Sequence, residues 1–131
     1  MRTIASAAVV VLLGTGVFAH HSHPDFQTDQ MATVDGRIES LKYENPHSHM
    51  TLLTGDATLY TIEWNAAHQL RLPGTNCFEK IYSETLDIGD HVIVVGLPAR
   101  DPLRHELVNV RQVYRPRDEW RWFRDDTRCR N

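Results

Sequence analysis

Hydrophobic and polar residues alternate along much of this 131-residue chain, a pattern typical of β-strands with one buried face. Gly, Pro, Asn and Asp residues interrupt the alternation at short intervals and indicate turns. We therefore expect five strands, over residues 31–43, 47–54, 57–64, 91–97 and 106–114. A short helix is expected over 66–72, because Asn65 can cap its beginning and Pro73-Gly74 would end it.

The order of these elements favours one fold class. Three strands, a helix and two further strands is the order of an OB-fold, a five-stranded Greek-key barrel. A small β-sandwich would show the same alternation and is the alternative. Within the first strand, Gly36 predicts a bulge or tight bend. The sequence thus predicts an all-β, OB-like barrel with one short helix.

The first nineteen residues have the pattern of a secretory signal peptide. Arg2 supplies a short positive region, residues 4–13 are almost entirely apolar, and small residues precede the expected cleavage after Ala19. The alternative is an uncleaved anchor, but residues 4–19 are fewer than the roughly 20 that a spanning helix needs. We expect a periplasmic or secreted protein with no stable membrane span after processing. Cleavage one residue later would expose His21 instead.

Removal of the signal leaves 112 residues, enough for one compact domain. The expected parts are the signal peptide, a flexible His-rich N-terminus, the OB-like barrel and an aromatic, Arg-rich tail, at residues 1–19, 20–30, 31–114 and 115–131. The full chain carries a net charge of −3 with histidines neutral. This balance argues against a nucleic-acid-binding protein.

The chain has two cysteines, Cys77 and Cys129. In an oxidising compartment they are expected to form one disulfide, which would join the tail to the barrel. On the chain-entropy model such a bond would stabilise the fold by about 3–4 kcal/mol. The alternative is two unpaired thiols, because Cys129 lies close to the end of the chain.

Several motifs of the chain are similar to those of one bacterial family. They are Val34-Asp35-Gly36-Arg37-Ile38, Tyr43-Glu44-Asn45-Pro46-His47-Ser48, Ile62-Glu63, Leu86-Asp87-Ile88-Gly89-Asp90-His91-Val92 and Gly96-Leu97-Pro98-Ala99-Arg100-Asp101, with His20-His21-Ser22 after the signal. Together they resemble the exported family catalogued as domain of unknown function 6152, over nearly the whole mature chain. The resemblance supports the fold and the export, but it implies no activity and no catalytic residue. His49 departs from the family, which usually has a large aromatic residue at this position.

Five of the eight histidines form two groups that could bind a metal ion: His20, His21 and His23, and His47 and His49. His47 and His49 are two apart on a predicted strand, so their imidazoles would project from one face, about 6–7 Å apart. The amino and ring nitrogens of a mature N-terminal His20 can chelate one ion. Either strand histidine would then complete a three-nitrogen site of the histidine-brace type, which suits Cu(II). Cleavage after His20 would instead let His21-Ser22-His23 form a square-planar chelate.

Copper is the first choice of cofactor because nitrogen ligands predominate, and zinc is the second. Both need deprotonated imidazoles, so affinity should fall between about pH 7 and pH 5. The alternative is that His47 only hydrogen-bonds within a turn and that the N-terminal histidines are solvated. His68, His91 and His105 are expected to be structural or exposed.

In the tail, Trp120, Arg121 and Trp122 could bind a ligand or partner by stacking and cation–π contacts. The alternative is that the aromatic side chains fold back over an open end of the barrel.

Two function classes follow from these features. One is an exported copper-binding module for storage, delivery or protection, and the other is a metal-free ligand-binding or assembly module of the cell envelope. The partner would be a small ligand or another exported protein. No catalytic residues are assigned, because Ser48 points away from the flanking histidines and no acylation motif or phosphate loop is present. An oxidative copper enzyme on the same ligands is a third and weaker hypothesis.

Overall fold

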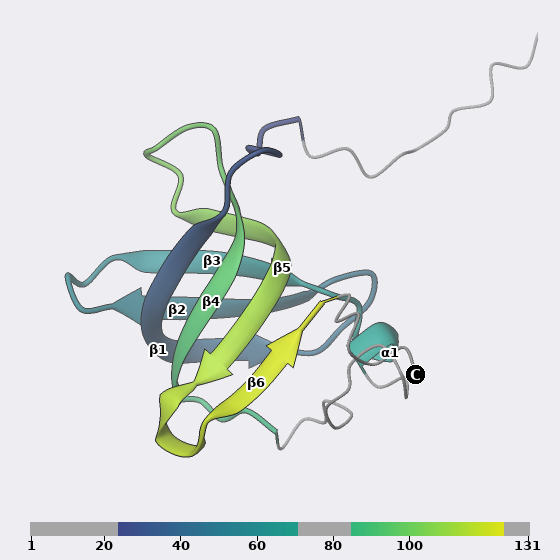
Figure 1. Ribbon diagram of the computed structural model, residues 1–131, viewed down its shortest axis with the longest axis vertical. Helices are drawn as coiled ribbons and strands as arrows, with labels where there is room; N and C mark the ends of the chain where they lie inside the picture. The colour runs from purple at the N-terminus through teal and green to yellow at the C-terminus, as the bar shows by residue number, and fades with distance from the viewer. Residues whose placement is uncertain (1–23, 71–84, 125–131) are drawn as a thin grey trace, which may run out of the picture.

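The computed structural model describes residues 24–70 and 85–124 (Figure 1). Its elements are β1 (Ala32–Lys42), β2 (Ser48–Thr54), β3 (Leu59–Trp64), α1 (Ala67–Leu70), β4 (His91–Pro98), β5 (Glu106–Arg115), the 3-10 helix η1 (Pro116–Asp118) and β6 (Trp120–Phe123). The five expected strands and the short helix are therefore confirmed to within a few residues at each end.

The strands form one sheet that closes on itself. Its order is β3-β2-β1-β4-β5-β6, with antiparallel pairing throughout. A parallel pairing of β3 with β5, at Thr61↔Glu106 and Ile62↔Leu107, joins the two sides of the sheet. This closure confirms the five-stranded OB-like barrel and excludes the sandwich.

Gly36 does not form the bulge that was expected there. The register between β1 and β2 shifts between Ile38 and Ser40, two residues further along. A Cβ atom on Gly36 would lie 2.9 Å from the carbonyl oxygen of Leu53. Gly36 therefore permits a close approach of the two strands, whereas the bulge itself falls at Glu39.

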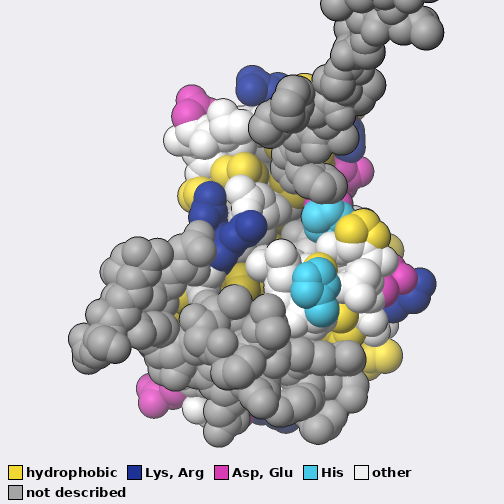
Figure 2. Space-filling view, turned by 90° about the vertical axis from the view of Figure 1, so that its right-hand side faces the viewer, with side chains coloured by type: hydrophobic (Ala, Val, Ile, Leu, Met, Phe, Trp, Pro, Cys, Tyr) yellow, Lys and Arg dark blue, Asp and Glu magenta, His cyan; other side chains and the backbone are white. Residues whose placement is uncertain are grey.

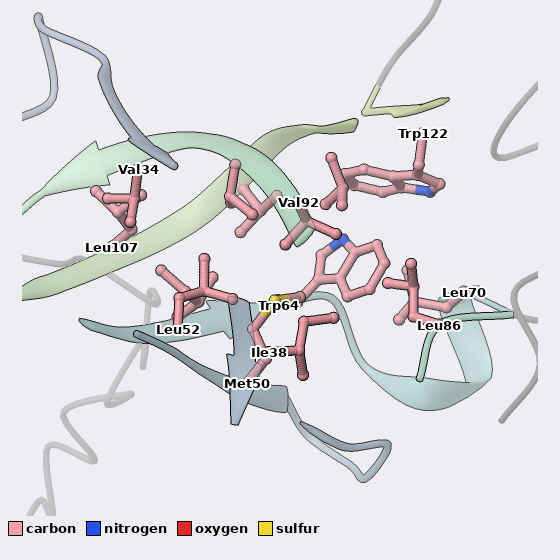
Figure 3. Close-up of a cluster of buried hydrophobic side chains, with 14 residues drawn as sticks. Val34, Ile38, Met50, Leu52, Trp64, Leu70, Leu86, Val92, Leu107 and Trp122 are labelled. Atoms are coloured by element: carbon pink, nitrogen blue, oxygen red, sulfur yellow. The ribbon is translucent and has the colours of Figure 1, made fainter. Parts of the chain in front are cut away.

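The barrel encloses a single main hydrophobic cluster (Figure 3). Alternate residues of the strands point inward, so that Ile38, Leu52 and Ile62 are completely buried. Trp64 and Trp122 meet edge to face at one end of the cluster, with ring centroids 5.1 Å apart and planes at 84°.

The start of the predicted C-terminal tail belongs to the sheet. After η1, β6 pairs with β5 from Gln112↔Phe123 to Arg115↔Trp120. This sixth strand was not expected from the sequence, because four residues with one inward-facing side chain give too little alternation to recognise. The described tail residues thus extend the barrel through Phe123.

Residues that precede β1 are also held against the barrel. The amide of Gln27 donates to the carbonyl of Pro98 at 2.9 Å, and the amide of Arg100 donates to the carbonyl of Asp25 at 2.8 Å. Phe26 is 7% exposed and packs in a small cluster of its own with residues of β4, β5 and the loop between them. Residues 24–27 therefore contact the barrel through both backbone hydrogen bonds and the Phe26 side chain. Within the described ranges, no helix has the length and hydropathy needed to cross a bilayer.

Candidate functional site

The loop between β1 and β2 carries the Asn-Pro-His-Ser motif and is fixed against α1. The amide of Ala67 donates to the carbonyl of Glu44 at 2.9 Å, and the amide of Ser48 donates to the carbonyl of Asn65 at 3.2 Å. Ser48 is fully buried and opposes Trp64 in the strand register. These backbone bonds bring the start of β2, the end of β3 and the helix together at one end of the barrel.

A pocket of about 450 Å³ opens at this end. Its walls come from the motif loop, the end of β3, α1, β5 and the residue after β6. The lining residues are Pro46, His47, Glu63, Trp64, Asn65, Ala66, His68, Gln69, Asn109 and Arg124. Figure 2 shows the side of the molecule on which α1 lies, where histidine side chains reach the surface among basic and polar neighbours.

The two strand histidines face different carboxylates. Nδ1 of His47 lies 3.4 Å from Oε1 of Glu63, and Nδ1 of His49 lies 3.1 Å from Oε1 of Glu44. His47 lines the pocket, whereas His49 lies outside it, opposite Lys42 in the register. In the register of β2 and β3, His49 also lies opposite Glu63, the residue that His47 contacts.

His68 lies in the same pocket as His47. Its Nδ1 atom is 2.8 Å from Oδ1 of Asn45, and its backbone amide donates to the same oxygen at 3.4 Å. From the sequence, His68 was expected to be structural or exposed, and it is an exposed residue here. The signal that could have found it is topological, because a helix that follows β3 must begin beside the start of β2 when those two strands form a hairpin.

The carboxylate beside His49 is ionised more readily than usual. The pKa of Glu44 is lowered, chiefly by the hydrogen bond from Lys42; desolvation opposes this, and the hydrogen bond with His49 adds to it. Lys42 Nζ is 2.7 Å from Glu44 Oε2. Glu44 is therefore shared between a lysine and a histidine at an exposed position.

Opposite the histidines, the pocket contains one guanidinium group. Arg124 donates a hydrogen bond to the side-chain oxygen of Asn109, a residue with a positive φ of 52° in β5. Among the residues with described positions, no group of three or more His, Cys, Asp or Glu side chains is arranged to hold a metal ion. Any metal bound here would need water, amide or N-terminal ligands in addition to imidazoles.

The other predicted site residues divide into two sets. His20, His21, His23, Cys77 and Cys129 lie outside the described residues. Of the predicted tail surface, Trp122 is 2% exposed and belongs to the core, so its assignment to a partner surface is wrong. Trp120 is half-buried under the guanidinium of Arg115, while the exposed Arg121 lies over the ring of Tyr114 at 4.7 Å.

Comparison with known proteins links the chain to a family of unknown function. No curated protein and no solved structure matches the chain significantly. Residues 8–109 match the model of a family of unknown function, DUF6152, which covers most of the chain. The match includes the motif loop, β1 to β4, α1 and the first part of β5. The chain therefore belongs to the DUF6152 family.

Proposed function

We propose that this protein is exported and binds Cu(II) at the end of the barrel that carries the motif loop. The observation that carries the proposal is that His47, a residue of the motif loop that lines the pocket, has its Nδ1 atom 3.4 Å from Oε1 of Glu63. Histidines that bind metals commonly donate their other ring N–H to a carboxylate, which fixes the tautomer and directs the remaining nitrogen to the metal.

The expected N-terminus favours copper over other ions. A mature chain that began at His20 would offer an amino nitrogen and an imidazole nitrogen to one ion, and nitrogen donors suit tetragonal Cu(II). Pro24 is anchored to the barrel by a hydrogen bond from Nε of Arg100 to its carbonyl, at 3.0 Å. Because four residues span at most about 14 Å, an amino group at His20 could lie no farther than this from Pro24. Zinc is the second choice.

The test uses protein processed in the periplasm, with its N-terminus confirmed by intact mass. Titration with Cu(II), followed by electron paramagnetic resonance, is expected to show one equivalent bound through nitrogen ligands. A His47→Ala variant should lose at least about tenfold in affinity, since one ligand is removed. A form with two extra residues before His20 serves as the control. Equal binding by this extended form would exclude the N-terminal ligands, and no binding by the processed protein would exclude the proposal.

A second candidate function is suggested by the size of the pocket. About 450 Å³ lies within the range of sites that take small molecules, and its lining combines apolar walls with a few polar groups. In this case the protein would bind a small ligand without metal, or assemble with another exported protein through Arg121 and Trp120. Native mass spectrometry of metal-free protein from the periplasm would detect a small ligand as a defined mass increase, and its absence would count against this candidate.

A further inference from the structure

We infer that His68 is a metal ligand together with His47, so that the ion lies in the pocket between the motif loop and α1 and not over the His47–His49 strand face. The inference rests on the proposed function, because it names the imidazoles that would hold the same ion. It assigns a role to a helix residue that sequence spacing does not connect with the motif.

The fold brings these two histidines to one cavity from separate elements. His47 precedes β2, and His68 lies in α1, directly after β3. The Ser48↔Trp64 pairing and the bond from the Ser48 amide to the Asn65 carbonyl place the two chain segments side by side. Both histidines line the pocket of about 450 Å³.

Hydrogen bonding fixes the tautomer of His68. The Asn45 atom that faces its ring also accepts the His68 backbone N–H, so this atom is the amide oxygen, which can only accept. Nδ1 of His68 must therefore carry the proton, and Nε2 carries the lone pair. An imidazole held in this way binds a divalent transition ion through Nε2 without first losing a proton.

The second ligand of the proposed site is the imidazole of His47. Nδ1 of His47 lies 3.4 Å from Oε1 of Glu63, which is an ion-pair distance. A neutral His47 with its proton on Nδ1 would carry its lone pair on Nε2. The motif thus supplies one ligand through His47 and, through the side chain of Asn45, orients the imidazole of His68.

The rest of the pocket is compatible with a divalent ion. Asn65 and Gln69 contribute side-chain amides, which with water can complete four positions around Cu(II). Among the described lining residues, Arg124 is the one arginine or lysine, and it donates to Asn109. His49 has no place in this arrangement, because it faces Glu44 outside the pocket.

The experiment compares His68→Ala with the matched control His49→Ala in periplasmically processed protein. Because His68 is an exposed residue, both variants should fold, and circular dichroism checks this. Copper affinity is expected to fall at least about tenfold in His68→Ala and less than about threefold in His49→Ala. The superhyperfine pattern of the Cu(II) resonance should lose one imidazole nitrogen in His68→Ala alone.

The outcomes separate this inference from the proposed function. If the wild-type protein binds Cu(II) and His49→Ala, not His68→Ala, weakens it, the pocket assignment is wrong while the copper proposal stands. If neither variant changes the affinity or the resonance, the described histidines other than His47 play no part and the inference fails. Absence of Cu(II) binding by the wild-type protein overturns both.

Discussion

Arg115 and Asp90 form a buried ion pair that joins the end of β5 to the turn before β4. Nη1 of Arg115 donates to Oδ2 of Asp90 at 2.9 Å, and their side chains are only 9% and 4% exposed. Arg115 also donates to both carboxylate oxygens of Asp118 and to the carbonyl of Thr85. Asp90 accepts from the amide of Asp87, as its place in a Gly-Asp turn suggests. One arginine therefore holds η1, β5 and the turn together.

Replacement of Asp90 by Ala should destabilise the protein strongly. It leaves the buried guanidinium of Arg115 without one of its two carboxylates, and loss of one partner of a buried pair costs about 3 kcal/mol. Urea denaturation measures this as a fall in the free energy of unfolding. The matched control is Arg117→Ala, which removes a 59% exposed contact to the same carboxylate and should cost less than about 1 kcal/mol. Equal effects of the two variants would contradict a central role for the buried pair.

Acid should destabilise the fold through the same group. Burial alone would raise the pKa of Asp90, but the Asp87 amide and the charges of Arg115 and Arg117 outweigh it and lower that pKa below the ordinary value of 3.8. The unfolded chain therefore takes up a proton first as pH falls, so the stability due to ionised Asp90 is present above about pH 4 and is lost below it. The free energy of unfolding, measured by urea titration from about pH 6 to pH 3, should decline more steeply for wild type than for Asp90→Asn. Parallel curves would contradict this assignment.

Removal of the Trp122 side chain should destabilise the barrel by about 3–5 kcal/mol, since it opens a cavity beside Trp64 in the core. Thermal denaturation and intrinsic fluorescence of Trp122→Ala check this. Arg121→Ala, on the exposed side of the same strand, should cost less than about 1 kcal/mol because it removes only a contact with Tyr114. A small effect of Trp122→Ala would mean that β6 is dispensable for the core.

A methyl group at Gly36 should be poorly tolerated. The added Cβ would lie 2.9 Å from the carbonyl oxygen of Leu53, so the strands must separate, at a cost of about 1–3 kcal/mol. Gly55→Ala is the control, because nothing lies within 4 Å of its added Cβ and the change should stay within about 0.5 kcal/mol. Equal stability of the two variants would show that the strand approach at Gly36 relaxes at no cost.

The strands of the barrel could be predicted from sequence because alternation and turn residues are local signals. Ile38, Met50, Leu52 and Ile62 all lie on the inward faces that alternation assigns to them. The position of the bulge could not be predicted from the local sequence, because a glycine within a strand can mark either a bulge or a close approach of two strands. β6 was missed because burial of Trp122 depends on its pairing with β5, which a short strand among arginines does not indicate.

Prediction of the site was limited in the same way, to relationships that are local in the sequence. Sequence spacing identified His47 and His49 as neighbours on one strand face, and that much follows from the two-residue period. Their partners Glu63 and Glu44 come from the next strand and the preceding loop, and spacing along the chain does not indicate these contacts. His68 joined the site only through the contact of α1 with the motif loop, a tertiary relationship that spacing along the chain does not encode.

Substitution of the carboxylates behind the imidazoles distinguishes the two possible positions of the ion. If Cu(II) lies in the pocket, Glu63→Ala should lower its affinity by about 10- to 100-fold, because His47 loses the carboxylate that lies beside its Nδ1 atom. Glu44→Ala removes the equivalent group from His49 and leaves the pocket histidines unchanged, so it should have little effect on affinity. Isothermal titration calorimetry at pH 7 compares the Cu(II) affinities of the two variants. Thermal denaturation without metal shows whether either variant is destabilised. A larger loss of affinity in Glu44→Ala would indicate that the ion lies on the strand face, because each carboxylate acts on the metal only through the imidazole that it contacts.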